Sequence, residues 1–194
     1  YATLVRPPVR GSGPVSSNTA ELKKMPGIVD VVTLPHGVAI VGETFDRVRR
    51  ARSALKVSWR SGLPGDAIDT DKDLQGYLGV ARDLKRTVIE WKAKGDTAKA
   101  LAGAARVVAH EYLTDHVYHA QPEPMNSTVL VHGDSAEVWV GTQAPTRTQI
   151  NVAKALGIPQ DNVKVNQQFL GGGFGRRATV EASVDAALIS KAVN

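Results

Sequence analysis

The chain has 194 residues, 42% of them hydrophobic, which is enough for one large domain or two small ones with a real core. Lysine and arginine outnumber aspartate and glutamate by 24 to 19, and this net charge of +5 favours anionic ligands only weakly. No run of about 18 apolar residues occurs, so we expect no transmembrane segment. The absence of cysteine excludes disulfides, thiolate nucleophiles and cysteine-ligated iron–sulfur clusters within the chain.

The first third of the sequence predicts a compact α/β unit. The helix expected there carries four arginines, which form either an ordinary solvated face or a contact to nucleic acid or another subunit. These are Arg47, Arg49, Arg50 and Arg52. The expected elements are, in order, a strand at 1–5, a loop at 7–14, a short helix at 20–25 capped by Thr19, a hairpin of strands 28–33 and 38–41, a helix at 43–55 and a strand at 55–59.

The middle of the chain, residues 61–104, is predicted to be a linker and surface segment. It holds one surface helix between Asp66 and Lys85, a strand at 87–91 and a short helix that Asp96 caps.

From Ala105 onward the sequence predicts alternating strands and helices. Because a strand, helix, strand succession requires a crossover connection, we expect some parallel pairing and a mixed α/β or α+β fold. The expected elements are strands at 106–112, 127–131, 136–140 and 162–169, a helix between Pro145 and Gly157, and a last helix from about Thr179. That last helical pattern is still running at Asn194, and Tyr1 begins inside a strand, so we expect a fragment of a longer protein.

The stretch Gly171-Gly172-Gly173-Phe174-Gly175-Arg176-Arg177 reads as a glycine turn between a strand and the last helix. Glycine leaves the backbone amides bare, the helix start adds partial positive charge and the two arginines add full charges, so the turn is a candidate phosphate or pyrophosphate site. A purely structural tight turn is the alternative. The stretch is neither a P-loop, because no Gly-Lys-Ser/Thr follows, nor a Rossmann fingerprint, because Arg176 replaces the third glycine.

Three further features are open to more than one interpretation. His110, His116 and His119, with Glu111 and Glu123, fit no known zinc spacing, and we assign no metal site. Glu123, held between two prolines, is either a general acid or base or the anchor of a loop.

The third feature is Gln143, which follows a strand and precedes a helix. If the two strands are neighbours, this position presents its amide near the glycine turn as a donor and acceptor.

Three motifs carry a resemblance to one family. They are His119-Ala120-Gln121-Pro122-Glu123-Pro124-Met125-Asn126, Gly141-Thr142-Gln143-Ala144-Pro145 and the glycine stretch through Arg177. In this order and spacing the chain resembles the molybdopterin-binding large subunit of the xanthine oxidase and aldehyde oxidoreductase family of molybdenum hydroxylases, above all the branch of the isoquinoline 1-oxidoreductase β subunit. Residues 1–60 resemble the family's α/β hammerhead domain and residues 105–194 the first part of its molybdopterin-binding domain.

The resemblance implies an oxidoreductase that inserts a water-derived oxygen into a C–H bond of an N-heterocycle or an aldehyde, in the bacterial cytoplasm or periplasm. The implied cofactor is molybdenum on a molybdopterin dinucleotide, in its cytosine form, with electrons passing to an iron–sulfur small subunit. Gln143 matches the glutamine that hydrogen-bonds an oxo ligand of molybdenum. Gly172, Gly173, Phe174, Gly175 and Arg176 match the segment that lies against the cofactor, and Phe174 would also shape the substrate pocket.

Two departures limit the carry-over. In xanthine-type members the glycine motif continues Gly-Lys-Glu, whereas here it continues Arg176-Arg177-Ala178, so we expect no purine hydroxylation. The family's catalytic glutamate belongs to a later part of the subunit that this chain does not contain, so the chain alone is expected to be inactive and to bind no cofactor. A non-enzymatic basic module for an anion, nucleic acid or partner subunit is the alternative.

Overall fold

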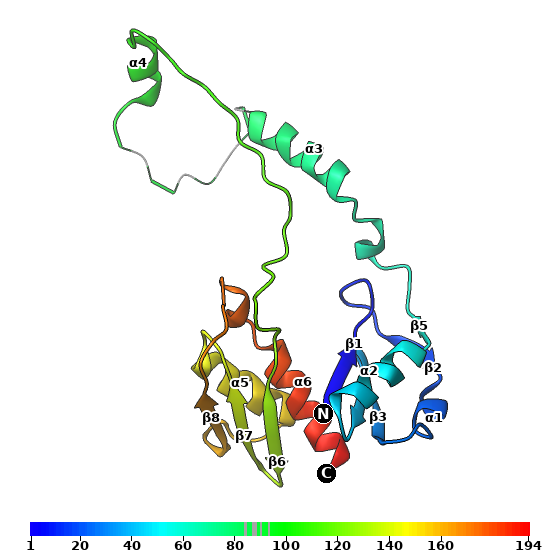
Figure 1. Cartoon of the computed structure of the whole chain (residues 1–194). Helices are drawn as coiled ribbons and strands as arrows, with labels where there is room; N and C mark the ends of the chain where they lie inside the picture. Colours follow the sequence, from blue (N-terminus) through cyan, green and yellow to red (C-terminus); the bar gives the residue numbers. More distant parts are fainter. Residues whose placement is uncertain (84, 87–88, 90, 93) are drawn as a thin grey trace. The chain divides into compact units, whose positions relative to one another are not determined.

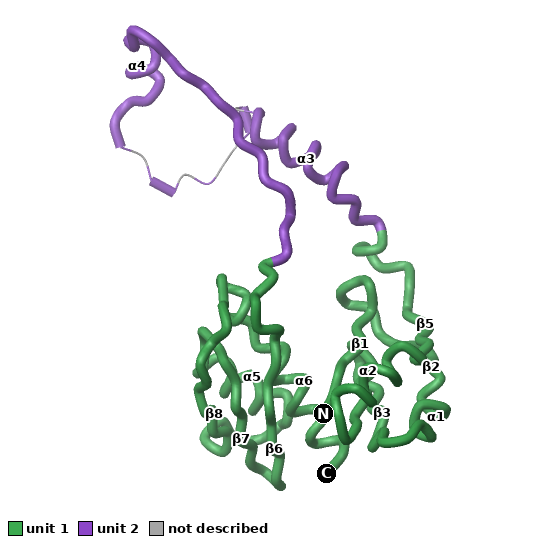
Figure 2. The backbone as a smooth tube through the Cα atoms, viewed as in Figure 1, with its two compact units in different colours: residues 1–66, 119–194 green, residues 67–118 purple. Residues whose placement is uncertain are grey.

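The computed structural model describes residues 1–83, 85–86, 89, 91–92 and 94–194. They form two compact units, one of residues 1–66 and 119–194 and the other of residues 67–118 (Figure 2). Helices and strands alternate in the first unit, so the predicted mixed α/β class is confirmed (Figure 1). The assignment of residues 1–60, 61–104 and 105–194 to separate domains stays a prediction.

The first part of the first unit holds two small antiparallel sheets. One has the strand order β1-β4-β3, and β2 pairs with β5 in the other. The elements are β1 (Ala2–Val5), β2 (Pro14–Ser17), α1 (Thr19–Leu22), β3 (Ile28–Leu34), β4 (Gly37–Gly42), α2 (Phe45–Ala54) and β5 (Val57–Trp59). The predicted β3–β4 hairpin is therefore confirmed. The predicted cap Thr19 is wrong, because Asn18 occupies the N-cap position.

Strand β4 is buried on both faces, which explains its unbroken apolar sequence. On one face Val38 and Ile40 pack against Val48 and Ala51 of α2. Ala39, on the other face, belongs to a different cluster that includes the last helix of the chain. The sheet β1-β4-β3 is thus a middle layer with helices on both sides.

The second part of the first unit is a three-stranded sheet of order β6-β7-β8 covered by two helices. β6 (Thr128–His132) runs antiparallel to β7 (Ser135–Val140), and β8 (Val163–Gln167) runs parallel to β7, so the predicted parallel pairing is confirmed. The helices are α5 (Pro145–Leu156) and α6 (Glu181–Val193), with the short 3₁₀ helices η2 (Gln160–Asn162) and η3 (Arg176–Ala178) before β8 and α6.

Local sequence explains α5 and the face it covers. Pro145 occupies its first turn and Gly157 ends it with a left-handed φ of 71°, as predicted. Val152, Ala153 and Leu156 of α5 pack against alternate residues of β7, which all point to this one face of the sheet.

Helix α6 is shared by the two sheets of the first unit. Its Ala187 packs in the core of β6-β7-β8, whereas Ile189 packs against Leu34 and Ala39 of the sheet β1-β4-β3. Asp185, also buried, pairs with Arg6 and accepts a 2.8 Å hydrogen bond from His36. The helix that follows the glycine turn is therefore held from both sides.

The second unit contains α3 (Thr70–Arg82) and α4 (Thr97–Ala102), reached from the first unit through η1 (Pro64–Ala67). Asp69 and Asp96 cap the two helices through their side chains, the latter as predicted. The strand predicted at 106–112 is wrong, because those residues form no strand and are exposed. The strand predicted at 87–91 falls partly outside the described residues. Among the helices that the structure describes, none is long and apolar enough to cross a membrane.

Candidate cofactor site

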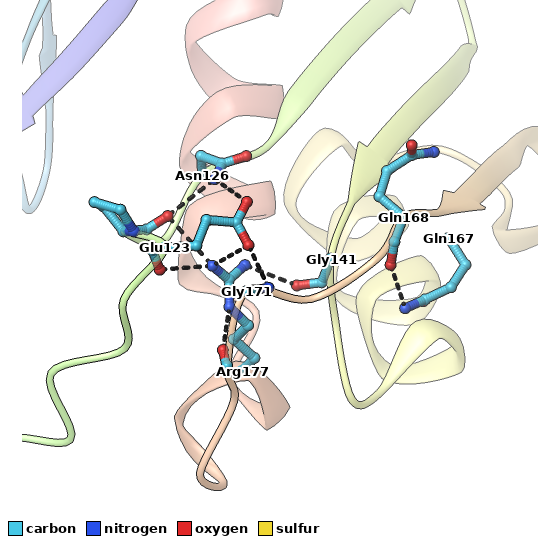
Figure 3. Close-up of polar contacts among 9 residues, drawn as sticks. Glu123, Asn126, Gly141, Gln167, Gln168, Gly171 and Arg177 are labelled. Atoms are coloured by element: carbon cyan, nitrogen blue, oxygen red, sulfur yellow. Dashed lines mark hydrogen bonds and ion pairs between the residues drawn. The ribbon is translucent and has the colours of Figure 1, made fainter.

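The candidate site lies where the parallel strands β7 and β8 end. Val140 and Gln167 are partners at this edge, and the Gln168 amide extends the ladder with a 3.0 Å bond to the Val140 carbonyl. The Gln167 side chain donates to the Thr142 carbonyl at 2.8 Å. Because both chains leave the sheet at the same edge, the segment with Gln143 and the glycine turn come together there, as Figure 3 shows for their flanking residues.

Gln143 contacts the glycine turn directly. Its Oε1 accepts a 3.1 Å hydrogen bond from the Gly175 amide, and its own amide donates to the Arg177 carbonyl at 3.0 Å. The side chain is exposed, and its Nε2 has no acceptor within the described residues. The predicted proximity is confirmed, and the role of Gln143 toward a ligand stays a prediction.

The backbone of the turn is folded in a way that favours glycine. Gly172, Phe174 and Gly175 have left-handed φ values of 97°, 50° and 81°. A left-handed φ costs nothing at glycine but is strained at Phe174, whose side chain is 65% exposed. The phenyl ring is therefore held out from the turn rather than buried in a core.

The glycines also make room for the protein's own side chains. A Cβ on Gly171 would stand 2.4 Å from the Glu123 Cβ, and one on Gly173 would stand 2.6 Å from the Gln143 Oε1. These two glycines therefore have a structural reason that the interpretation as bare ligand-binding backbone did not contain.

Some amides of the turn are engaged within the chain and others are not. The Gly171 amide donates to Glu123 at 2.8 Å and the Gly175 amide to Gln143. Within the described part of the chain, no acceptor lies in reach of the amides of Gly172, Gly173 and Phe174. Three successive amides in a left-handed bend can form a concave donor surface for an oxygen-bearing ligand.

The expected contribution of the last helix is different in the structure. η3 and Thr179–Val180 separate the glycine turn from α6, which begins at Glu181. The turn does not open α6 directly, so the predicted alignment of the helix amides with the turn is wrong.

Arg177 does not face a ligand. It is 2% exposed, and its guanidinium donates only to groups of the chain itself, among them the carbonyls of Gly141 at 3.1 Å and Gly172 at 2.9 Å. The interpretation of Arg177 as a charge offered to phosphate is therefore wrong. Arg176 is half-buried and pairs with Glu181 at 3.3 Å and with the Thr179 hydroxyl, and its cofactor role stays a prediction.

Glu123 anchors the segment before β6 to the turn. Its Oε2 lies 2.8 Å from both the Gly171 amide and the Arg177 Nη2, and its Oε1 accepts from Asn126 at 2.9 Å (Figure 3). The Asn126 hydrogen bond, the Gly171 amide and the Arg177 charge hold the pKa of Glu123 below its usual value against the opposing effect of burial. An ionised carboxylate with three partners favours the anchoring role over that of a general acid.

One buried group near this anchor was missed by the sequence interpretation. Gln121, two residues before Glu123, is 8% exposed, and its Nε2 has no partner within the described residues. Nothing in the sequence separates it from an exposed glutamine. The histidines show no metal arrangement: among the residues that the structure describes, no group of three His, Cys, Asp or Glu could hold a metal ion. In the second unit, Glu111 instead pairs with Arg82 at 2.6 Å.

Comparison with known proteins decides the family of the chain. Residues 80–194 match the family described as the molybdopterin cofactor-binding domain. The chain belongs to this family. The matched residues include β6, β7, α5, β8 and α6, which are the elements that build the candidate site.

The relatives of this molybdopterin-binding chain are subunits of oxidoreductases. The whole chain aligns at 36% identity with the β subunit of isoquinoline 1-oxidoreductase from Brevundimonas diminuta, and at 27% with one of the subunits of nicotinate dehydrogenase from Pseudomonas putida. It spans 26% and 16% of their lengths. The solved structure of quinoline 2-oxidoreductase from Pseudomonas putida 86 shares the fold, with a TM-score of 0.70 at 17% identity over 99% of this chain and 29% of that one. The resemblance to xanthine oxidase-type molybdenum hydroxylases is confirmed.

The residues at the site fit a molybdopterin group. The exposed Nε2 of Gln143 and the three amides from Gly172 to Phe174 are neutral donors without acceptors in the described chain, as a ligand rich in oxygen atoms requires. They share one edge of the sheet, and no side-chain carboxylate among their direct hydrogen-bond partners would repel an anion except Glu123, whose charge Arg177 neutralises.

Proposed function

We propose that this chain is one part of the catalytic subunit of a molybdenum hydroxylase, and that the edge formed by Gln143 and the glycine turn is one wall of its cofactor site. The single observation that carries the proposal is the Gln143–Gly175 hydrogen bond, because it unites two motifs that are 32 residues apart in the sequence. The family match and the names of the relatives support the same assignment.

In this proposal the cofactor is molybdenum on a molybdopterin dinucleotide of the cytosine form, and it supplies the oxygen insertion and the two-electron chemistry. Gln143 donates its Nε2 proton to an oxygen of the cofactor. The backbone of Gly172, Gly173 and Gly175 and the side chain of Arg176 line the same wall. These groups are fixed before the ligand arrives, so they stabilise developing negative charge without reorganising.

Phe174 is assigned to the substrate side of this wall. Its ring is exposed although its backbone is strained, which indicates that the turn presents the ring rather than buries it. An aromatic ring suits a flat N-heterocycle, the class to which isoquinoline, quinoline and nicotinate belong, with aldehydes as the second class. The iron–sulfur partner is proposed because the chain has no cysteine and its relatives are named as single subunits.

The catalytic base is proposed to lie on another part of the subunit, so the 194 residues alone are inactive. A basic module for nucleic acid is less well supported, because the arginines of α2 pair with acidic residues of the same surface. Arg47 pairs with Glu43 at 2.9 Å, and Arg50 pairs with Asp46 at 2.8 Å.

The test is Gln143→Ala in the parent polypeptide, meaning the longer subunit that carries this chain, assembled with its partner. We expect kcat to fall by about tenfold or more, the effect of removing one positioned neutral donor, while the thermal unfolding midpoint stays unchanged because the side chain is exposed. Gln160→Ala, at the opposite end of β8, is the matched control and keeps full turnover. Unchanged turnover in Gln143→Ala would refute the assigned role.

A further inference from the structure

One buried guanidinium joins all three sequence motifs of the site. The Arg177 side chain donates from Nε to the Gly172 carbonyl at 2.9 Å, from Nη1 to the Gly141 carbonyl at 3.1 Å and from Nη2 to the Glu123 carbonyl at 2.8 Å. A longer bond of 3.3 Å reaches Pro124. Each acceptor belongs to a different part of the chain, and Figure 3 shows Glu123, Gly141 and Gly171 gathered around the arginine.

The carbonyl of the same residue holds the segment that carries Gln143. The Arg177 oxygen accepts from the Gln143 amide at 3.0 Å and from the Thr142 hydroxyl at 3.0 Å. Arg177 therefore contacts the chain just before the glutamine and just before Gly173, one through Gly141 and the other through Gly172. The spacing between the Gln143 side chain and the free amides of the turn depends on where this one residue lies.

Only arginine provides this set of contacts. Its planar guanidinium offers five N–H donors in a fixed fork, whereas lysine offers a point charge that cannot reach carbonyls on three sides at once. Its burial also requires a counter-charge, because an unpaired buried cation is strongly unfavourable. Glu123 supplies that charge at 2.8 Å, and its oxygen also receives the Gly171 amide.

We propose that Arg177 and Glu123 are a positioning pair, which sets the distance between Gln143 and the amides of Gly172, Gly173 and Phe174. The pair touches no cofactor or substrate itself. The inference deepens the proposed function and rests on it for its meaning, but the positioning effect is measurable in the protein without cofactor.

The experiment measures amide hydrogen exchange in the cofactor-free parent polypeptide. In Arg177→Lys, the peptide that spans residues 168–176 should exchange about tenfold faster, as expected for the loss of about one hydrogen bond, and so should the peptide at 141–144. β6 and β7 should keep wild-type exchange, because their ladder does not involve Arg177. Arg147→Lys, on α5, is the matched control and should leave all of these rates unchanged.

Glu123→Gln tests the other member of the pair and serves if Arg177→Lys unfolds the protein. It keeps an acceptor for the Gly171 amide but removes the charge opposite Arg177, so exchange at 168–176 should again rise selectively. Glu137→Gln, which removes a carboxylate that pairs with Lys164 on the outer face of the sheet, should have no such effect.

Two results would overturn the positioning role: wild-type exchange at 168–176 in both variants, or faster exchange spread equally over the glycine turn and β6-β7, as for a residue that merely holds the fold. Molybdenum analysis of the same parent separates this inference from the proposed function. Absent molybdenum in the wild-type parent with selective exchange in the variants would sink the function and leave the positioning pair intact.

Discussion

Two neighbouring glycine positions should respond in opposite ways to the same added methyl group. In Gly173→Ala the new Cβ meets only the end of the Gln143 side chain, 2.6 Å from Oε1 and 2.8 Å from Cδ. That side chain is exposed and flexible, so it can swing away, and Gly173 has no left-handed φ to strain an alanine. In Gly171→Ala the Cβ meets the Glu123 Cβ at 2.4 Å, an atom fixed to the backbone.

The magnitudes follow from these contacts. Gly173→Ala loses the Gln143–Gly175 hydrogen bond, which costs about 0.5–1.5 kcal/mol, and regains about 0.4–1 kcal/mol from the stiffer unfolded chain. Its free energy of unfolding should stay within about 1 kcal/mol of wild type. Gly171→Ala must move the Glu123 segment or the turn, and such overpacking costs about 1–3 kcal/mol.

Urea unfolding of the chain, followed by circular dichroism, measures both free energies. In the parent, Gly173→Ala should nonetheless lower the molybdenum content, because the displaced Gln143 amide no longer lies where the turn holds it. Equal destabilisation by the two alanines, or full stability of Gly171→Ala, would refute the reasoning from Cβ contacts.

The remaining predictions concern charge and affinity. Because the folded-state pKa of Glu123 is lowered, its stabilising contribution is present above the usual value of 4.5 and disappears as the pH falls through the folded value, so the stability gap between wild type and Glu123→Gln in urea titrations should narrow in acid and not widen. Asp185→Asn removes the partner of Arg6 and His36 and should cost about 2 kcal/mol, whereas the exposed Asp161→Asn should cost almost nothing in the same titrations. The isolated chain should bind the released cofactor no more tightly than about 1 μM in equilibrium dialysis, and a tighter dissociation constant would contradict the assignment of only one wall to this chain.

Local patterns were sufficient for the elements whose partners are near in sequence. The β3–β4 hairpin, the helix between Pro145 and Gly157 and the parallel strands on either side of it could all be predicted, because turn residues and apolar periodicity act over short distances. β2 was assigned to a loop because Pro14 stands in a glycine-rich cluster, and it is a strand only through its distant partner β5. Residues 106–112 have the apolar content of a strand, but no ladder partner for them exists within the described residues.

The site divides in the same way. The meeting of Gln143 and the glycine turn follows from parallel strands that end at one edge, so sequence reasoning reached it. The role of Arg177 does not, because its acceptor at Glu123 lies 54 residues away and a buried arginine cannot be distinguished from an exposed one in a run such as Arg176-Arg177. The two arginines looked alike in the sequence, and the structure gives only Arg176 access to solvent.

The most direct test of the central claim is metal analysis of the parent polypeptide, purified with its partner subunit from a host that makes molybdenum cofactor. Under our proposal the assembled protein contains about one molybdenum per catalytic subunit, and Gln143→Ala keeps the fold while turnover drops. An intact, correctly assembled parent that contains no molybdenum would contradict the account.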